Sequence, residues 1–211
     1  MSPLVLDVPR LRNLCCTKLH FLPPKQAIRG DHDLNPDTAH EMDGGRTPIP
    51  AAVLVPIVQR PDGLTVLLTQ RTATLASHAG QVAFPGGKVD ADDAGPLAAA
   101  LREAEEEIGL ERRFVEPLGF LDLYTTGTGY SVAPVVALVS EGFVLSINPG
   151  EVAVTFEAPL AFLMDPANHQ RQSREWRGKL RHFYAMPYND HVIWGATAGM
   201  IRNLYEKLNQ A

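Results

Sequence analysis

The chain is poor in cysteine, in long apolar runs and in excess positive charge. Its 211 residues contain two cysteines, which are neighbours, Cys15 and Cys16. Adjacent cysteines rarely bridge each other, so the sequence excludes a disulfide framework and predicts a reducing, cytoplasmic environment. No apolar run approaches the length that spans a membrane. The segment around Asp7 and Pro9 is not typical of a signal peptide, so we expect neither membrane insertion nor export.

The charge balance bears on the class of partner. The formal net charge is −5, from 19 basic and 24 acidic residues. Proteins that bind nucleic acid over their whole surface are usually basic, so this class is disfavoured. An acidic protein still binds a phosphate-containing small molecule where metal ions screen the repulsion. We therefore predict a small-molecule substrate, with no nucleic acid and no membrane as partner, and leave the oligomeric state open.

The pattern along the chain predicts an N-terminal extension followed by one domain. Residues 1–48 carry six prolines and polar stretches, and we expect one short helix near 8–14. From residue 49 to 211 the pattern predicts a single α/β domain with a mixed sheet between helices. Strands are predicted at 51–58 and 64–71, with a turn at 60–63 between them. Downstream we expect strands over 114–126, 127–139 and 142–158, a short helix near 159–164, a hairpin within 173–186 and an amphipathic helix within 194–210.

The most informative stretch runs from Gly86 to Leu110. On a helix, Glu103, Glu106 and Glu107 fall within about one 100° arc. This arrangement opposes helix stability, because Glu103 and Glu107 are like charges at i,i+4, which costs roughly 0.2–0.5 kcal/mol, and because acids in the last turn oppose the helix dipole. Such a conflict indicates a function, and oxygen ligands for a hard divalent cation are the simplest one. The alternative is a solvated acidic face.

The surroundings of these glutamates match a known motif. Arg102 lies four residues before Glu106, placed to orient its carboxylate. The stretch resembles the Nudix box, which reads Gly, five residues, Glu, seven residues, then Arg-Glu-apolar-x-Glu-Glu-x-Gly-apolar; Arg102 to Leu110 matches residue for residue. Asp93 stands where the box has glutamate, and eight residues separate it from Arg102, which leaves its role open. The resemblance implies a Nudix fold, a mixed sheet sandwiched between helices (α/β/α). It also implies that Glu103, Glu106 and Glu107 bind Mg²⁺, for which Mn²⁺ can substitute.

Residues before the box narrow the expected substrate. Leu67 to Arg71, then Leu75, His78, Gly80 and Phe84-Pro85-Gly86-Gly87, are similar to the extra motif of the coenzyme A pyrophosphatase branch, with Thr72 in place of Ser or Ala. The strings at 183–188 and 193–198 also resemble that branch. The resemblance implies hydrolysis of the diphosphate of coenzyme A to adenosine 3′,5′-bisphosphate and 4′-phosphopantetheine. It implies substrate contacts for Arg71, His78, Gly86 and Gly87.

Several alternatives remain open at this point. Arg71 could instead pair with a surface acid, and His78 could cap a loop. A broader pyrophosphatase that cleaves ADP-ribose or dinucleotides shares the ADP half of the substrate. A non-catalytic nucleotide sensor is disfavoured because such modules commonly lose a box glutamate or the arginine, and this chain keeps both. The basic run within 169–182 predicts a charged edge hairpin or a contact with the ribose 3′-phosphate.

A loop acid is the remaining expected catalytic group. Glu151 follows Asn148-Pro149-Gly150 in a turn before a predicted strand, which resembles the place where Nudix chains carry a loop acid. A carboxylate there would act as general base towards the attacking water. The alternatives are that Glu151 is a solvated loop residue or hydrogen-bonds the turn, or that Glu106 is the base. The predicted catalytic residues are therefore Arg102, Glu106 and Glu151.

Overall fold

The structure is built around a mixed sheet, and the computed structural model describes residues 6–36, 47–73, 78–176 and 178–209. Within these ranges the larger sheet consists of β1 (Ala27–Gly30), β2 (Ile49–Arg60), β3 (Gly63–Arg71), β4 (Val82–Ala83), β5 (Gly86–Lys88), β6 (Val115–Phe120), β7 (Leu123–Thr125), β8 (Tyr130–Val139) and β9 (Val152–Pro159). A smaller sheet consists of β10 (Gln170–Trp176), β11 (Lys179–Tyr188) and β12 (His191–Trp194). The α-helices are α1 (Val8–Lys18), α3 (Pro96–Ile108), α4 (Leu160–Leu163) and α5 (Ala196–Asn209).

The long strands β2 and β8 form the middle of the larger sheet. They pair in parallel from Ile49↔Tyr130 to Val58↔Val139, as expected for two apolar runs buried on both faces. β2 turns back through residues 61–62 into antiparallel β3, which confirms the predicted turn. The strand order is β1-β7-β8-β2-β3-β4, with β5 on β2, β6 on β8 and β9 on β3. β5 and β4 therefore fill the end of the sheet where β2 and β3 are not paired with each other.

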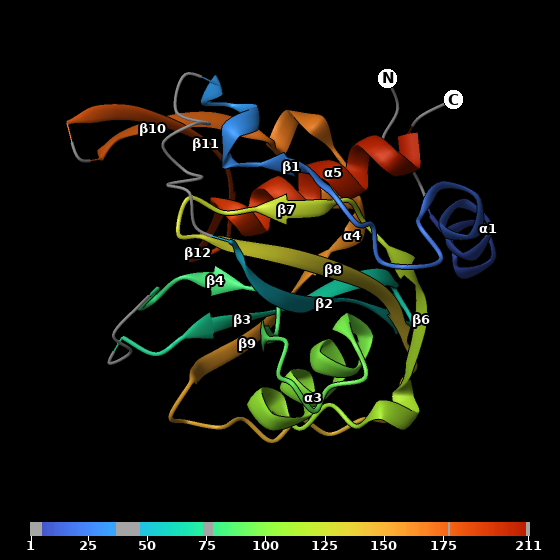
Figure 1. The fold of residues 1–211 in the computed structure, drawn as a ribbon. Coiled ribbons are helices and arrows are strands. Elements are labelled where there is room, and N and C mark those ends of the chain that lie inside the picture. Colours follow the sequence, from blue (N-terminus) through green and yellow to red (C-terminus); the bar gives the residue numbers. More distant parts are fainter. Residues whose placement is uncertain (1–5, 37–46, 74–77, 177, 210–211) are drawn as a thin grey trace.

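The two faces of the sheet carry separate apolar clusters. Alternate residues of β2 point to opposite faces, so Val55 and Ile57 join one cluster while Leu54 and Val58 join the other. Helices α1, α4 and α5 contribute to the first cluster, and α3 contributes to the second. Figure 1 shows α3 on one side of the sheet and α1 and α5 on the other. This confirms the predicted α/β/α sandwich.

The described part of the N-terminal extension packs on the domain. The Asp7 carboxylate caps α1 by accepting the Arg10 N–H at 2.8 Å, and Leu11 and Cys15 are buried. α1 confirms the helix predicted near 8–14 and continues to Lys18. β1 then pairs in parallel with β7. Residues 37–46 lie outside the described ranges, and the domain boundary at 48/49 stays a prediction.

One prediction about the strands needs correction. The expected strand over 142–158 exists only as β9, because the preceding residues pair with the end of α3 instead: the N–H of Ser146 donates to Ile108 O, and that of Asn148 to Glu107 O, each at 2.9 Å. The amphipathic helix predicted within 194–210 is confirmed as α5, which begins at Ala196 because β12 uses residues 191–194. The hairpin is confirmed as β10 and β11. Among the described residues no helix has the length and apolarity to cross a membrane.

Candidate active site

Helix α3 is set in place by its ends and by its apolar face. It begins at Pro96 and ends at Ile108. The following Gly109 caps it, with a left-handed φ of 68° and an N–H that donates to Glu105 O at 2.9 Å. Its apolar side chains Leu101, Ala104 and Ile108 are buried against the sheet. Seating that face leaves Glu107 2 % exposed, whereas the Glu106 side chain remains 57 % exposed.

The Gly86-Gly87 pair lets α3 approach the sheet closely. β5 pairs with β2 through Val53↔Gly86 and Ala52↔Gly87. A Cβ on Gly86 would lie 2.3 Å from Ala52 O, and its φ of 154° also favours glycine. A Cβ on Gly87 would lie 2.4 Å from Glu103 Oε1. The space that this glycine leaves open is therefore filled by the Glu103 carboxylate, which lies against the backbone of β5.

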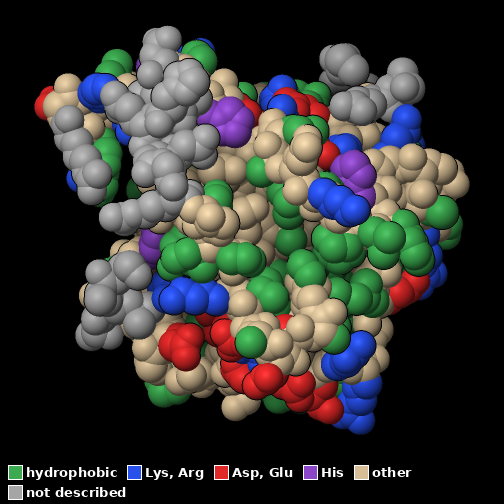
Figure 2. Space-filling view, in the orientation of Figure 1, with side chains coloured by type: hydrophobic (Ala, Val, Ile, Leu, Met, Phe, Trp, Pro, Cys, Tyr) green, Lys and Arg blue, Asp and Glu red, His purple; other side chains and the backbone are tan. Residues whose placement is uncertain are grey.

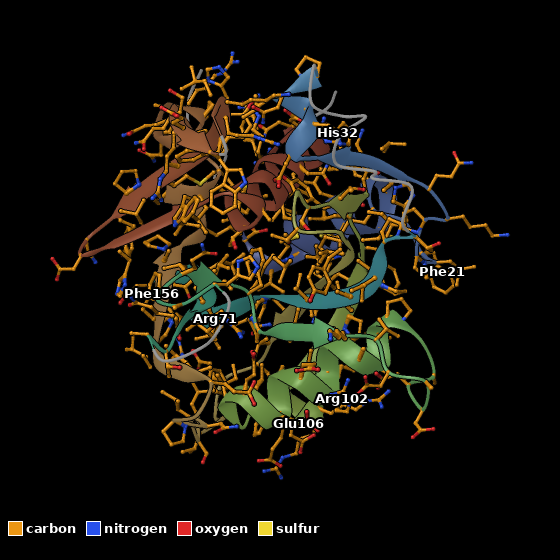
Figure 3. The ribbon with its side chains drawn as sticks, turned by 60° about the vertical axis from the view of Figure 1, so that its left-hand side comes forward. Phe21, His32, Arg71, Arg102, Glu106 and Phe156 are labelled. Atoms are coloured by element: carbon orange, nitrogen blue, oxygen red, sulfur yellow. The ribbon has the colours of Figure 1, made fainter. Side chains whose placement is uncertain are left out.

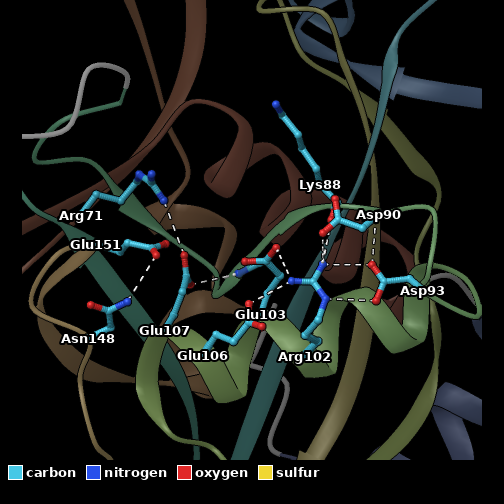
Figure 4. A network of polar contacts seen from close by, with 11 residues as sticks. Arg71, Lys88, Asp90, Asp93, Arg102, Glu103, Glu106, Glu107, Asn148 and Glu151 are labelled. Carbon is cyan, nitrogen blue, oxygen red and sulfur yellow. Dashed lines mark hydrogen bonds and ion pairs between the residues drawn. The ribbon is translucent and has the colours of Figure 1, made fainter.

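Arg102 joins the acids of α3 to the loop that precedes it (Figure 4). Its guanidinium donates from Nε and Nη2 to the two oxygens of Asp93, at 3.1 and 2.9 Å. Nη1 donates to Glu103 and to Glu106, both at 3.0 Å, and Nη2 also reaches Lys88 O at 3.2 Å. The predicted contact between Arg102 and Glu106 is confirmed. Asp93, whose role was left open, binds this arginine bidentately, and the hydrogen bonds from Arg102 lower the pKa of Asp93.

Glu107 is the least compensated acid of the group. Its Oε2 accepts the Gly86 N–H at 3.2 Å, and its Oε1 lies 3.6 Å from Arg71 Nη1. Burial raises the pKa of Glu107 to about 7, and burial likewise raises the pKa of Glu103. Arg71 Nε is buried and finds no hydrogen-bond acceptor among the residues the structure describes. One guanidinium therefore faces the most buried box glutamate with unused donor capacity.

The predicted loop acid lies beside this group. Glu151 Oε1 accepts from Asn148 Nδ2 at 3.3 Å, and its backbone carbonyl accepts the Thr72 N–H at 3.0 Å. After burial, the charges of Glu103 and Glu151 are among the causes that raise the pKa of Glu107. Figure 4 shows Arg71, Glu107 and Glu151 together above α3. The turn 148–151 is tied to both α3 and β3.

Of the motif that precedes the Nudix box, only part lies close to the carboxylates of α3. Arg71 lies within it, whereas His78 is exposed and its Nδ1 pairs with Gln81 Oε1 at 2.9 Å, which corresponds to the loop-capping alternative. Leu75 of the same motif lies outside the described residues, as does Arg177 of the basic run. Of the other basic residues of that run, Arg171, Arg174, Lys179 and Arg181 lie on the hairpin of β10 and β11, whereas His169 is buried before β10.

The carboxylate oxygens of the box glutamates are the type of ligand that a hard divalent cation prefers. Glu103 and Glu107 are buried to different degrees on one side of α3, and a glycine backbone leaves room for the first of them. In the part of the chain that is described, however, no three His, Cys, Asp or Glu side chains converge on one point. Arg102 and Arg71 hold the carboxylates instead. Glutamate side chains are long enough for rotation to bring their oxygens together without moving the helix.

Acidic and basic side chains lie next to each other on the surface around α3 (Figure 2). Figure 2 shows acidic side chains gathered over α3, with basic side chains directly beside them. In Figure 3, Arg102 and Glu106 lie on α3 and Arg71 lies on the strand above it. Sequence reasoning missed the contact of Asp93 with Arg102, whereas the contact of Asn148 with Glu151 corresponds to the alternative that Glu151 hydrogen-bonds the turn. The only signals available for the two contacts were the displaced acid of the box and the Asn-Pro-Gly turn.

Known proteins resemble this chain over most of its length. The family model of the NUDIX domain matches residues 48–178. The protein named "Uncharacterized Nudix hydrolase NudL" from Photorhabdus laumondii subsp. laumondii is 44% identical over 158 residues, which are 75% of this chain and 84% of that one. Its namesake from Escherichia coli strain K12 is 45% identical over 155 residues, 73% of this chain and 80% of that one.

Solved structures are similar in part. The NUDIX domain of Shewanella oneidensis NrtR, complexed with ADP ribose, has a TM-score of 0.48 at 17% identity and covers 82% of this chain and 95% of that one. DR0079 from Deinococcus radiodurans has a TM-score of 0.49 at 14% identity and covers 74% of this chain and 83% of that one. The domain match and the two relatives above confirm the resemblance that the box carries, and the chain belongs to the Nudix hydrolase family.

Proposed function

We propose that this Nudix hydrolase cleaves the diphosphate of coenzyme A, giving adenosine 3′,5′-bisphosphate and 4′-phosphopantetheine. The single observation that carries the proposal is the approach of Arg71 to Glu107 at 3.6 Å. Arg71 belongs to the motif that resembles the coenzyme A branch, and Glu107 belongs to the Nudix box. The two sequence signals thus meet in one place, with an unused guanidinium donor available for a phosphate oxygen.

Nudix hydrolases generally use divalent metal ions such as Mg²⁺. In this chain Glu103, Glu106 and Glu107 would hold the ion: Glu103 and Glu107 lie beside the Gly86-Gly87 backbone, and Arg102 joins Glu106 to Glu103. When bound, a divalent cation neutralises phosphate oxygens and lowers the pKa of its water. It would also supply the positive charge that buried Glu107 lacks.

We propose a separate role in substrate binding or catalysis for each remaining site residue. Arg71 binds a diphosphate oxygen, and Gly86 and Gly87 are proposed as substrate contacts from the motif alone, since the space beside Gly87 holds the Glu103 carboxylate. Arg102 holds Glu103 and Glu106 in orientation. Glu151 accepts a proton from the attacking water, whose oxygen bonds to one phosphorus while the bond from that phosphorus to the bridging oxygen breaks. The bridging oxygen leaves with the other phosphate. His78 is proposed as a further substrate contact from the motif alone.

The test is an assay with defined substrates. Purified protein is incubated with Mg²⁺ and coenzyme A, 3′-dephospho-coenzyme A or ADP-ribose, with Mn²⁺ in parallel, and the products are separated by chromatography. We expect turnover of coenzyme A with the two products named above. Cleavage of ADP-ribose with no cleavage of coenzyme A would overturn the substrate and favour the broader pyrophosphatase. Tight binding without turnover in any metal would favour the sensor.

The setting of this activity is a further proposal. The two cysteines include one buried thiol, Cys15, and one exposed thiol, Cys16, and no disulfide is needed to hold the described fold. This pattern supports a cytoplasmic location. Coenzyme A or one of its derivatives would be the partner there, with no nucleic acid or membrane required.

A further inference from the structure

We propose that Asn148 is a positioning residue that holds the carboxylate of Glu151 towards the box glutamates. The inference rests on the proposed role of Glu151 as general base. Asn148 does not need to touch substrate. Asn148 would affect turnover only through the position of the Glu151 carboxylate.

Three contacts of Asn148 join three parts of the site. Its backbone N–H donates to the carbonyl of Glu107 at 2.9 Å, at the end of α3 where the last carbonyls lack partners within the helix. Its side-chain Oδ1 accepts the Gly150 N–H at 3.1 Å, which closes an Asx turn. Its Nδ2 donates to Glu151 Oε1 at 3.3 Å. One residue therefore links a box glutamate, the turn and the loop acid.

The turn is also fixed from the other side. The Thr72 N–H donates to Glu151 O at 3.0 Å, one residue after Arg71. The backbone of Glu151 is thus held between β3 and α3, and the amide of Asn148 contacts its carboxylate. A general base must lie within hydrogen-bond reach of its proton, and a misplacement of about 1 Å can cost on the order of 100-fold in rate. An amide donor at this place therefore controls turnover more than substrate binding.

Two substitutions separate the turn from the orientation of Glu151. Asn148→Asp keeps an acceptor for the Gly150 N–H but removes the donor to Glu151 and places a like charge beside it. Asn148→Ala removes both contacts. We expect Asn148→Asp to keep a Tm close to that of the wild type, while kcat falls on the order of tenfold and KM changes less than about twofold. Asn148→Ala should lose both stability and kcat.

A double-mutant cycle tests whether the effect passes through Glu151. In the Glu151→Gln background, Asn148→Asp should cause little further loss of kcat, because the carboxylate that it misplaces is already absent. Equal loss in both backgrounds would overturn the inference, as would Asn148→Asp with wild-type kcat. The assay uses whichever diphosphate the wild type cleaves. Absence of turnover by the wild type would count against the proposed function. An active wild type with an unaffected Asn148→Asp variant would count against the role of Asn148 alone.

Discussion

Two carboxylates are buried to nearly the same extent on opposite faces of the sheet, and they differ in how their charge is compensated. Asp122 is 5 % exposed and Glu107 is 2 % exposed. Lys207 Nζ and His20 Nε2 each lie 2.8 Å from Asp122 Oδ1, and Asn203 Nδ2 donates to Oδ2 at 3.0 Å. Glu107 has one backbone N–H at 3.2 Å and one guanidinium at 3.6 Å.

The pKa values follow from these surroundings. Burial alone would raise the pKa of Asp122, but hydrogen bonds from Lys207, His20 and Asn203 hold it below its usual value. Burial raises the pKa of Glu107 to about 7 because its partners are fewer and Glu103 is a like charge nearby. Asp122 has the surroundings of an acid that stabilises the fold. Glu107 has the surroundings of an acid whose charge a bound cation would compensate, and this difference supports our proposal that the active site lies on the α3 side of the sheet.

Removing the charge of Glu107 should give the largest effect. Glu107→Gln keeps the size of the side chain but removes an anionic oxygen ligand. We expect turnover at saturating Mg²⁺ to fall by roughly 100- to 1,000-fold. The control is Glu105→Gln, an exposed glutamate in the same turn of α3. If Glu107→Gln hydrolyses the substrate at a near-normal rate, Glu107 is no principal ligand.

Removing the charge of Asp122 should lower stability and leave turnover nearly unchanged. Asp122→Asn leaves Lys207 facing a neutral amide in a largely buried place, and breaking a buried ion pair costs roughly 3 kcal/mol, or about 6–12 °C in Tm for a chain of this size. We expect turnover at 25 °C to remain within about twofold, because α3 lies on the other face. Differential scanning calorimetry and the hydrolysis assay measure the two quantities. A large loss of kcat in folded protein would show that the two sides are coupled.

The sequence predicted the functional side better than the stabilising side. Glutamates at a fixed spacing from Arg102, with glycines before and after, form a local pattern, and local patterns survive in a sequence. The residues around Asp122 come from three separate parts of the chain: the link between β6 and β7, helix α5, and the segment after α1. No regular spacing in the sequence connects them. The residues before the predicted turn at 148–151 were expected to form a strand, although the backbone of Ser146 and Asn148 pairs with the end of α3. Contacts between distant segments depend on packing that periodicity does not record.

The pKa of Glu107 also predicts a dependence of stability on pH in the absence of metal. The folded protein holds a proton on Glu107 up to a pH of about 7, whereas an unfolded glutamate loses it near 4.5. Stability should therefore fall as pH rises from 4.5 to 7 and stay lower above that value. At pH 8 in EDTA, we expect Glu107→Gln to raise Tm by up to roughly 7–14 °C.

Thermal unfolding measured across pH 4.5–8 tests this linkage. Glu105→Gln serves again as the matched control and should keep the wild-type slope. Saturating Mg²⁺ should reduce the difference between wild type and Glu107→Gln, because the ion stabilises only the protein that keeps its ligand. Parallel curves for the wild type and Glu107→Gln would contradict the raised pKa.

The smallest expected effect concerns Asp93, which resembles Asp122 in its compensation but lies on the functional side. Its bidentate contact with Arg102 fixes the guanidinium that also holds Glu103 and Glu106. Asp93→Asn weakens that contact without removing it, so we expect kcat/KM to fall by about tenfold and Tm to change little. Asp93→Glu, which restores the residue type of the box but keeps the longer spacing, should recover most of the activity because a carboxylate again faces Arg102. Wild-type kinetics for Asp93→Asn would mean that the contacts of Arg102 within α3 are enough to orient it. The number of partners that compensate the charge of an acid would then not distinguish structural from functional acids in this fold.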